Sequence, residues 1–268
     1  MKELHFAYRM TLRYDPPVRG QRFTLRCVPP STPVQQVQAL DVQVTPRVFL
    51  SEGTDGFGNL CLYGLSEGVI GSFTVTVSGD ARTGLAPGET APEAFRLGCF
   101  RYASPLTRPG EALVRLAERV GGADAAPVAY ALHCMEVMAD SFAYTPGVTG
   151  MTTTAEEAAA LGQGVCQDMA HVLLALLRMK RIPCRYVCGM MLGEGASHAW
   201  VEVCDGARWI GLDPTNHHPA DDGYIRISAG RDAGDCLINR GIVTGAARQT
   251  SQISVSVRET SSPARTER

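Results

Sequence analysis

The sequence contains no run of 18 apolar residues, no internal repeat and no low-complexity tract, which excludes a membrane-spanning helix, a repeat array and a fibrous chain. It also lacks an excess of charge of one sign. The 25 Lys and Arg residues stand against 27 Asp and Glu residues, which gives a formal net charge of −2. This balance gives no electrostatic reason to expect nucleic acid or an anionic membrane as a partner.

The start of the chain lacks an apolar segment of signal-peptide length, because residues 1–6 already alternate polar and apolar side chains. The expected location is therefore the bacterial cytoplasm. Eight of the nine cysteines fall mostly within apolar patterns, namely Cys27, Cys61, Cys99, Cys134, Cys184, Cys188, Cys204 and Cys236. We expect these eight to be small buried hydrophobes in a reducing compartment.

The first part of the chain has the pattern of β-strands. Of the 268 residues 45% are hydrophobic, which is enough for one large or two modest domains. Every second residue is apolar in four early stretches, residues 4–14, 23–27, 40–44 and 73–77. Residues 1–80 are thus predicted to form an all-β, sandwich-like N-terminal domain. Residues 81–109, rich in Gly, Ala and Pro, are predicted to form a linker.

The pattern then becomes helical. Apolar residues recur at helical spacing over 111–120 and 128–142, and Thr154 with Glu157 makes a capping box. The stretch 167–179 is apolar on nearly every face, which predicts a buried helix.

Strands return after this helix. They are predicted over residues 185–191, 198–204, 209–212 and 253–257. Residues 110–257 are therefore predicted to pack a helix against an antiparallel sheet, which makes the chain an α+β protein. The polar residues 258–268 are predicted to be a disordered tail.

Cys166 stands at the start of the buried helix, directly after a segment with two glycines. Gly162 and Gly164 suit a tight entry turn that leaves the thiol at the helix N-terminus. The free amides and the positive end of the helix dipole favour a thiolate there. The same amides can stabilise an oxyanion on a carbonyl that the sulfur attacks.

A predicted β-hairpin brings an imidazole and a carboxylate together. The segment Asp205-Gly206 is the turn signal between two strands, and we expect these two residues to be the centre of the turn. In that register His198 lies directly opposite Asp213, about 5 Å away, so the carboxylate can hold the imidazole in one tautomer. Cys166, His198 and Asp213 are thus the predicted catalytic triad.

Three further residues are candidates for the pocket. Trp200 shares a strand face with His198 and either walls the thiol pocket or is plain core. Gln163 either donates to an oxyanion or is structural, and Asn216 either supports Asp213 or caps a turn. No metal site is expected. Cys184 and Cys188 lie four residues apart on a strand, about 13 Å, and the pair His217-His218 has no partner at ligand spacing.

Several motifs together resemble the bacterial transglutaminase-like superfamily, whose members are often described as cysteine proteases. The resemblance is carried by residues 164–171 around Cys166, 181–187, 198–203 and 213–216. It extends to residues 144–149, 230–232, 240–241 and the segment Asp55-Gly56-Phe57-Gly58-Asn59. It implies a papain-like core after a bacterial transglutaminase-like N-terminal region.

The predicted function is thiol-dependent acyl transfer on an amide or peptide bond of a peptide or protein substrate, without a cofactor. Hydrolysis is favoured over amine transfer because the relatives are more often regarded as peptidases and no calcium-loop pattern occurs. Two alternatives stay open. One is transglutaminase-type cross-linking, and the other is a catalytically silent binding or accessory module whose N-terminal domain docks a protein partner.

Overall fold

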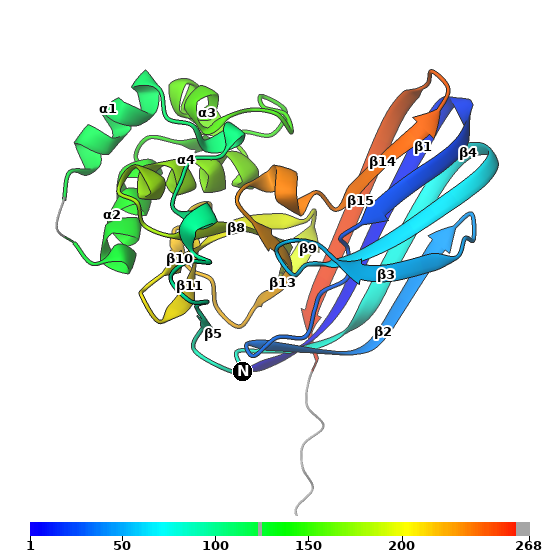
Figure 1. The fold of residues 1–268 in the computed structure, drawn as a ribbon, viewed down its shortest axis with the longest axis horizontal. Helices are drawn as coiled ribbons and strands as arrows, with labels where there is room; N and C mark the ends of the chain where they lie inside the picture. The colour runs from blue at the N-terminus through cyan, green and yellow to red at the C-terminus, as the bar shows by residue number, and fades with distance from the viewer. Residues whose placement is uncertain (123–124, 261–268) are drawn as a thin grey trace, which may run out of the picture.

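The computed structural model describes residues 1–122 and 125–260, which form a large sheet beside a region of helices and strands (Figure 1). The large sheet, here the long sheet, has seven strands with β2, β4, β1, β15 and β9 in order, while β14 also pairs with β1 and β3 with β4. Its strands are β1 (Lys2–Leu25), β2 (Gln35–Thr45), β3 (Leu50–Thr54), β4 (Leu60–Thr83), β9 (Gly193–Gly195), β14 (Asn239–Thr244) and β15 (Arg248–Glu259).

Alternation along β1 explains why one face of the long sheet is buried. From Leu4 to Tyr14 the even-numbered side chains are buried, whereas most odd-numbered ones face solvent. The buried face also contacts Met190, Ile225 and Ile227, which belong to the other sheet. The predicted sandwich is wrong in one respect, since these strands form one continuous sheet and not two facing sheets.

The C-terminal strand belongs to the long sheet. β15 pairs antiparallel with β1 from Leu4 opposite Glu259 to Asp15 opposite Arg248. The expectation that residues 253–257 join the same sheet as residues 198–204 is therefore wrong. Alternating polarity shows that a strand has one buried face, but it does not say which sheet supplies the partner.

The second sheet, here the core sheet, has six strands with β12, β11, β10, β8 and β13 in order and β5 on the edge of β11. Its strands are β5 (Glu89–Thr90), β8 (Cys184–Met191), β10 (His198–Cys204), β11 (Arg208–Asp213), β12 (His218–Pro219) and β13 (Tyr224–Gly230). All its strand pairings are antiparallel. The predicted mixture of helices with antiparallel sheets is confirmed.

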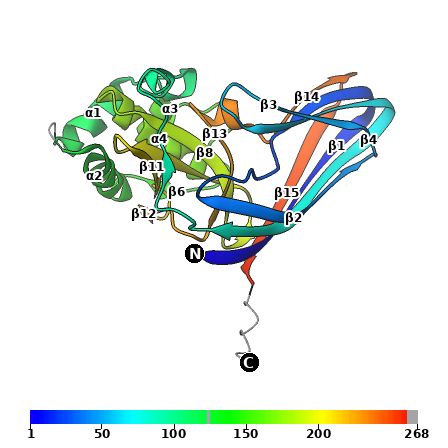
Figure 2. The ribbon, with the colours of Figure 1, turned by 60° about the horizontal axis from the view of Figure 1, so that its bottom comes forward.

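The α-helices of the described residues lie beside the core sheet on the side away from the long sheet (Figures 1 and 2). They are α1 (Glu111–Val120), α2 (Pro127–Ala139), α3 (Ala155–Leu161) and α4 (Cys166–Met179). One apolar cluster joins α4 to Ala199, Val201 and Val203 on β10. No helix of the described ranges is long and apolar enough to cross a membrane.

The predicted linker and tail contain ordered structure. Residues 81–83 complete β4, and β5 then adds to the edge of the core sheet. The described ranges also contain the short 3-10 helices η1 (Gly98–Phe100), η2 (Pro105–Thr107) and η3 (Ala233–Cys236). Of the predicted disordered tail, Arg258 and Glu259 belong to β15, whereas residues 261–268 lie outside the described part of the chain.

The segment 55–59 joins the two sheets. The Asp55 carboxylate accepts hydrogen bonds from the Phe57 and Asn59 backbone amides and from the Arg26 guanidinium. This holds the Asn59 side chain against β13, where it donates to the Ala229 carbonyl and accepts from the Ala229 amide, both at 2.8 Å. The Asn59 side chain thus makes the two hydrogen bonds to Ala229 that the backbone of a neighbouring strand would otherwise make.

We expect Asn59→Ala to lower the free energy of unfolding by about 3 kcal/mol, because it leaves a buried amide and a buried carbonyl of Ala229 without partners. Urea unfolding measures the change. Gln43→Ala is the matched control, because Gln43 is exposed on β2, and it should change the free energy by less than about 0.5 kcal/mol. Equal losses in both variants would show that the Asn59 bonds contribute little.

Candidate active site

The turn before α4 presents Cys166 at the helix N-terminus. Cys166 is the first residue of the helix and is partly exposed. α3 ends at Gly162, which adopts a left-handed conformation with φ +63°. The chain then forms β7 (Gln163–Gly164), which pairs in parallel with β6 (Ala143–Tyr144). The predicted entry turn and the predicted place of the thiol are both present.

Asp168 holds this turn in shape. Its buried Oδ2 accepts hydrogen bonds from the Val165 amide at 2.8 Å and from Thr149 Oγ1 at 2.6 Å. Gly164 is required here, because a Cβ on it would lie 2.6 Å from the same oxygen. Sequence analysis missed this role of Asp168, although an acidic residue in the first turn of a helix is the signal for such a cap.

The structure brings His198 and Asp213 into contact. His198 Nε2 lies 2.6 Å from Asp213 Oδ2, and the aspartate is fully buried. His198 begins β10 and Asp213 ends β11, so the pair stands at the end of the hairpin away from its turn.

The predicted hairpin register is wrong by two residues. Cys204 pairs with Trp209 and Val201 with Leu212, because Gly206 and Ala207 are the centre of the turn. The Asp205 side chain fixes this turn by accepting from the Ala207 and Arg208 amides. A shift of two keeps every side chain on its face, so His198 meets Asp213 diagonally instead of directly across.

Three side chains donate to one oxygen of Asp213. Besides His198, Tyr224 Oη and Asn216 Nδ2 both lie 2.7 Å from Oδ2. The other oxygen accepts from the Thr215 and Asn216 amides. Asn216 therefore contacts the predicted aspartate, as proposed from the sequence. Tyr224 was missed, because it lies on β13 and no strand pairing links that strand to β11.

The electrostatics of the pair follow from this geometry. Burial alone raises the pKa of Asp213, but the bonds from His198, Tyr224 and Asn216 overcome it and hold the pKa at about 2. Burial lowers the pKa of His198, whereas the bond to Asp213 and then the interaction with the Cys166 sulfur raise it to about 9. The Asp213 carboxylate and the Cys166 sulfur thus both favour the protonated form of the His198 ring.

Trp200 packs beside the imidazole. Its ring is nearly parallel to the His198 ring, with centroids 6.4 Å apart, and meets Tyr224 edge-on at 5.3 Å. Gly189 makes room for it, because a Cβ there would lie 2.5 Å from the indole and 2.3 Å from the Ile225 carbonyl. Trp200 is 3% exposed, so it supports His198 from the interior.

The candidate Gln163 and the buried His171 lie apart from this contact network. The Gln163 side chain is exposed on β7, three residues before the thiol. His171 is buried on α4, where it accepts a hydrogen bond from the Ala233 amide. In the described ranges no group of three or more His, Cys, Asp and Glu side chains has an arrangement that could hold a metal ion.

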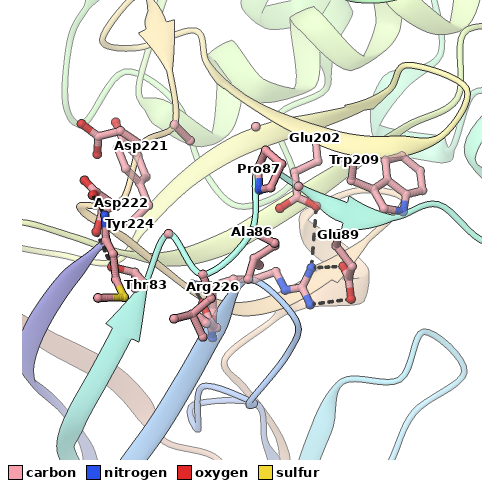
Figure 3. Close-up of a pocket in the computed structure, with 18 of the residues that line it drawn as sticks. Thr83, Ala86, Pro87, Glu89, Glu202, Trp209, Asp221, Asp222, Tyr224 and Arg226 are labelled. Carbon is pink, nitrogen blue, oxygen red and sulfur yellow. Dashed lines mark hydrogen bonds and ion pairs between the residues drawn. The ribbon is translucent and has the colours of Figure 1, made fainter.

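A cavity of about 660 Å³ is not lined by Cys166 or His198. It lies where the segment 83–89 crosses the core sheet, and Trp200 and Tyr224 form part of its wall (Figure 3). Ion pairs from Arg226 to Glu89 and Glu202 cross one end. The Cys166 thiol instead lies at the partly exposed start of α4. The cavity therefore contacts the residues around His198 and Asp213 through Trp200 and Tyr224.

Comparisons with known proteins identify the families to which the two parts of the chain are similar. Residues 114–214 match the family model of the transglutaminase-like superfamily, and residues 4–82 match that of the bacterial transglutaminase-like N-terminal region. The family expected from the sequence motifs is therefore confirmed.

Curated relatives include two uncharacterized mycobacterial proteins. One from Mycobacterium leprae is 39% identical over 112 residues, which cover 38% of this chain and 40% of that protein. One from Mycobacterium tuberculosis is 35% identical over 133 residues, which cover 43% of this chain and 42% of that protein. The match spans about two-fifths of the length of these relatives.

The fold is shared with a solved structure from Cytophaga hutchinsonii that bears the name "Putative Cysteine Protease". The two are 22% identical with a TM-score of 0.82, over 98% of this chain and 92% of that one. The chain belongs to the transglutaminase-like superfamily and carries the bacterial transglutaminase-like N-terminal region ahead of its core.

Proposed function

We propose that this protein catalyses thiol-dependent acyl transfer on an amide or peptide bond, with Cys166 as nucleophile, His198 as acid and base, and Asp213 as the group that orients His198. The observation that carries the proposal is the 2.6 Å contact between the His198 ring and the buried Asp213, and the Cys166 sulfur is one of the groups that raise the pKa of that ring. A nucleophile, a base and an orienting acid are the parts that such chemistry needs.

In the first half of the reaction the Cys166 thiolate attacks the carbonyl carbon, and the C–N bond of the substrate breaks. The backbone N–H of Cys166 and the side chain of Gln163 are the proposed donors to the oxyanion. His198 gives its proton to the departing amine. With its pKa raised to about 9 by Asp213 and Cys166 against the effect of burial, His198 holds that proton at neutral pH.

The second half resolves the thioester on Cys166. Water attacks the acyl carbon, His198 takes a proton from the water, and the carboxylic acid leaves as the thiol is restored. We propose hydrolysis in preference to amine transfer, because Cys166 is partly exposed and water can reach the thioester. The name of the Cytophaga hutchinsonii protein is in keeping with this choice.

The proposed substrate is a peptide or a protein. A cytoplasmic location and a protein partner for the N-terminal region remain predictions from the sequence alone.

At pH 7 we expect iodoacetamide to alkylate Cys166 at least about tenfold faster than the other eight cysteines, and His198→Ala to slow that reaction by about 10²-fold. Peptide mass spectrometry measures each site. Cys99 is an internal comparison, because it is more exposed than Cys166 and so excludes accessibility as the cause. His133→Ala, an exposed position on α2, should leave the rate unchanged. Equal labelling at Cys99 and Cys166 would favour a silent binding module.

In an NMR titration the His198 ring should change protonation near pH 9, and Asp213→Asn should lower this midpoint by more than one pH unit, because it removes the strongest contact that favours the protonated ring while burial remains. The pKa of His198 in the folded protein lies above the ordinary value of 6.5. The protonated ring therefore contributes its full stabilisation to the folded state below pH 6.5, and this contribution declines as the pH rises to about 9. Asp80→Asn, which affects only the exposed His5, is the control. A midpoint near 6.5 in the wild type would contradict the ion pair.

Intact-mass spectrometry with peptide and amine libraries should reveal an acyl adduct on Cys166 that decays to free acid. We expect less than about one tenth of the adduct to appear as amide at millimolar amine, because water is in large excess at a partly exposed thioester. Cys166→Ser is the control for adduct position. Predominant amide product would replace hydrolysis by transglutaminase-type chemistry.

A further inference from the structure

The segment from residue 144 to residue 161, here the entrance segment, carries an unusual number of exposed apolar side chains. The exposed fractions are 56% for Tyr144, 45% for Val148, 65% for Met151 and 54% for Leu161. Single exposed apolar residues need no explanation, but several on one short segment mark a contact surface.

Three hydrogen bonds tie the entrance segment to the residues around the thiol. The Thr145 amide donates to the Gly164 carbonyl at 2.8 Å, and Thr149 Oγ1 donates to Asp168 Oδ2 at 2.6 Å. Gln167 Nε2 donates to the Met151 carbonyl at 3.3 Å. The residues that anchor the segment are Gly164, two residues before Cys166, and Gln167 and Asp168, one and two residues after it. Residues 145–151 of the entrance segment are therefore held against the turn that carries the thiol.

Tyr144 shows this closeness directly. Burial, and then the Cys166 sulfur, raise the pKa of the Tyr144 hydroxyl, so the ring stands within electrostatic reach of the thiol. At the far end, Leu161 lines a hollow of about 470 Å³ with Thr152, Thr153, Glu157 and Ala160. This space is large enough for a bulky aliphatic or aromatic side chain.

The charge of the entrance segment restricts what it can bind. It contains Glu156 and Glu157 and no Lys, Arg or His. The Glu156 carboxylate accepts hydrogen bonds from the backbone amides of Gly110, Ala112 and Leu113. The Glu157 carboxylate accepts a hydrogen bond from the Thr154 amide and so caps the N-terminus of α3. An acidic substrate side chain would thus find two like charges and no cation, whereas an apolar one finds apolar surface.

We propose that the entrance segment binds the apolar side chain of an extended peptide next to the carbonyl that Cys166 attacks, and that it selects against acidic side chains there. The inference rests on the proposed function and adds a substrate class to it. Val148 and Met151 are the specificity-determining residues, because both are exposed and both adjoin an anchor to the turn at the thiol.

Two peptide chloromethyl ketones of the form acetyl-Xaa-glycyl, with Xaa as Leu or Asp, test the proposal. In each the Cys166 sulfur displaces chloride and forms a thioether, so mass spectrometry gives the labelling rate. We expect the Leu probe to react at least about tenfold faster than the Asp probe, which is the effect of burying part of one Leu side chain. In Val148→Ser/Met151→Ser the ratio of the two rates should fall below about threefold.

Dividing the Leu-probe rate by the Asp-probe rate within one variant cancels any general change in the reactivity of the Cys166 thiol. Phe49→Ser is the matched control, because Phe49 is 87% exposed and lies between β2 and β3 on the long sheet, and it should keep the wild-type ratio. Circular dichroism verifies that the double variant is folded. Equal rates for the two probes, at a thiol that iodoacetamide labels rapidly, would overturn the specificity and leave the proposed function standing. A Cys166 that resists iodoacetamide as well would overturn both.

Discussion

The buried carboxylate of Asp213 is the constraint on which the candidate site depends. An ionised carboxylate with no exposure to water is costly unless donors surround it. Here five hydrogen bonds reach its two oxygens, from His198, Tyr224, Asn216 and the amides after the strand. These donors come from two strands and a turn, so the ionised carboxylate can be buried with all its partners only when the core sheet is assembled. The same charge raises the pKa of His198 and thereby sets its proton affinity.

The fold keeps the other parts of the site at fixed positions. α4 is buried along nearly its whole length against β8 and β10, which leaves only its first turn to reach the surface with Cys166. On the opposite face of the core sheet, Trp200 packs against His198 in a space that Gly189 leaves open. The long sheet lies behind β8 and β13 and is joined to β13 through Asn59. The imidazole is therefore positioned from both faces of one sheet.

Sequence patterns were sufficient for much of this arrangement. Strand periodicity located β1, glycines before an apolar stretch located the Cys166 turn, and a turn signal between two strands paired His198 with Asp213. The register was wrong by two residues and the contact was still found, because faces alternate with a period of two. Patterns failed where the partner is distant in the chain. The long-sheet place of β15, the bond from Tyr224 and the role of Asn59 join elements between 11 and about 250 residues apart.

The sequence by itself determined which segments become strands or helices and pointed to Cys166, His198 and Asp213 as candidate site residues, because periodicity, capping and turn preferences act over a few residues. The tertiary structure alone decided which strands share a sheet, how many donors reach Asp213, and that hydrogen bonds hold the entrance segment against the residues around Cys166. Those features arise when distant segments pack, and both the contacts that raise the pKa of His198 and the burial that makes an unpaired carboxylate costly exist only in the packed state.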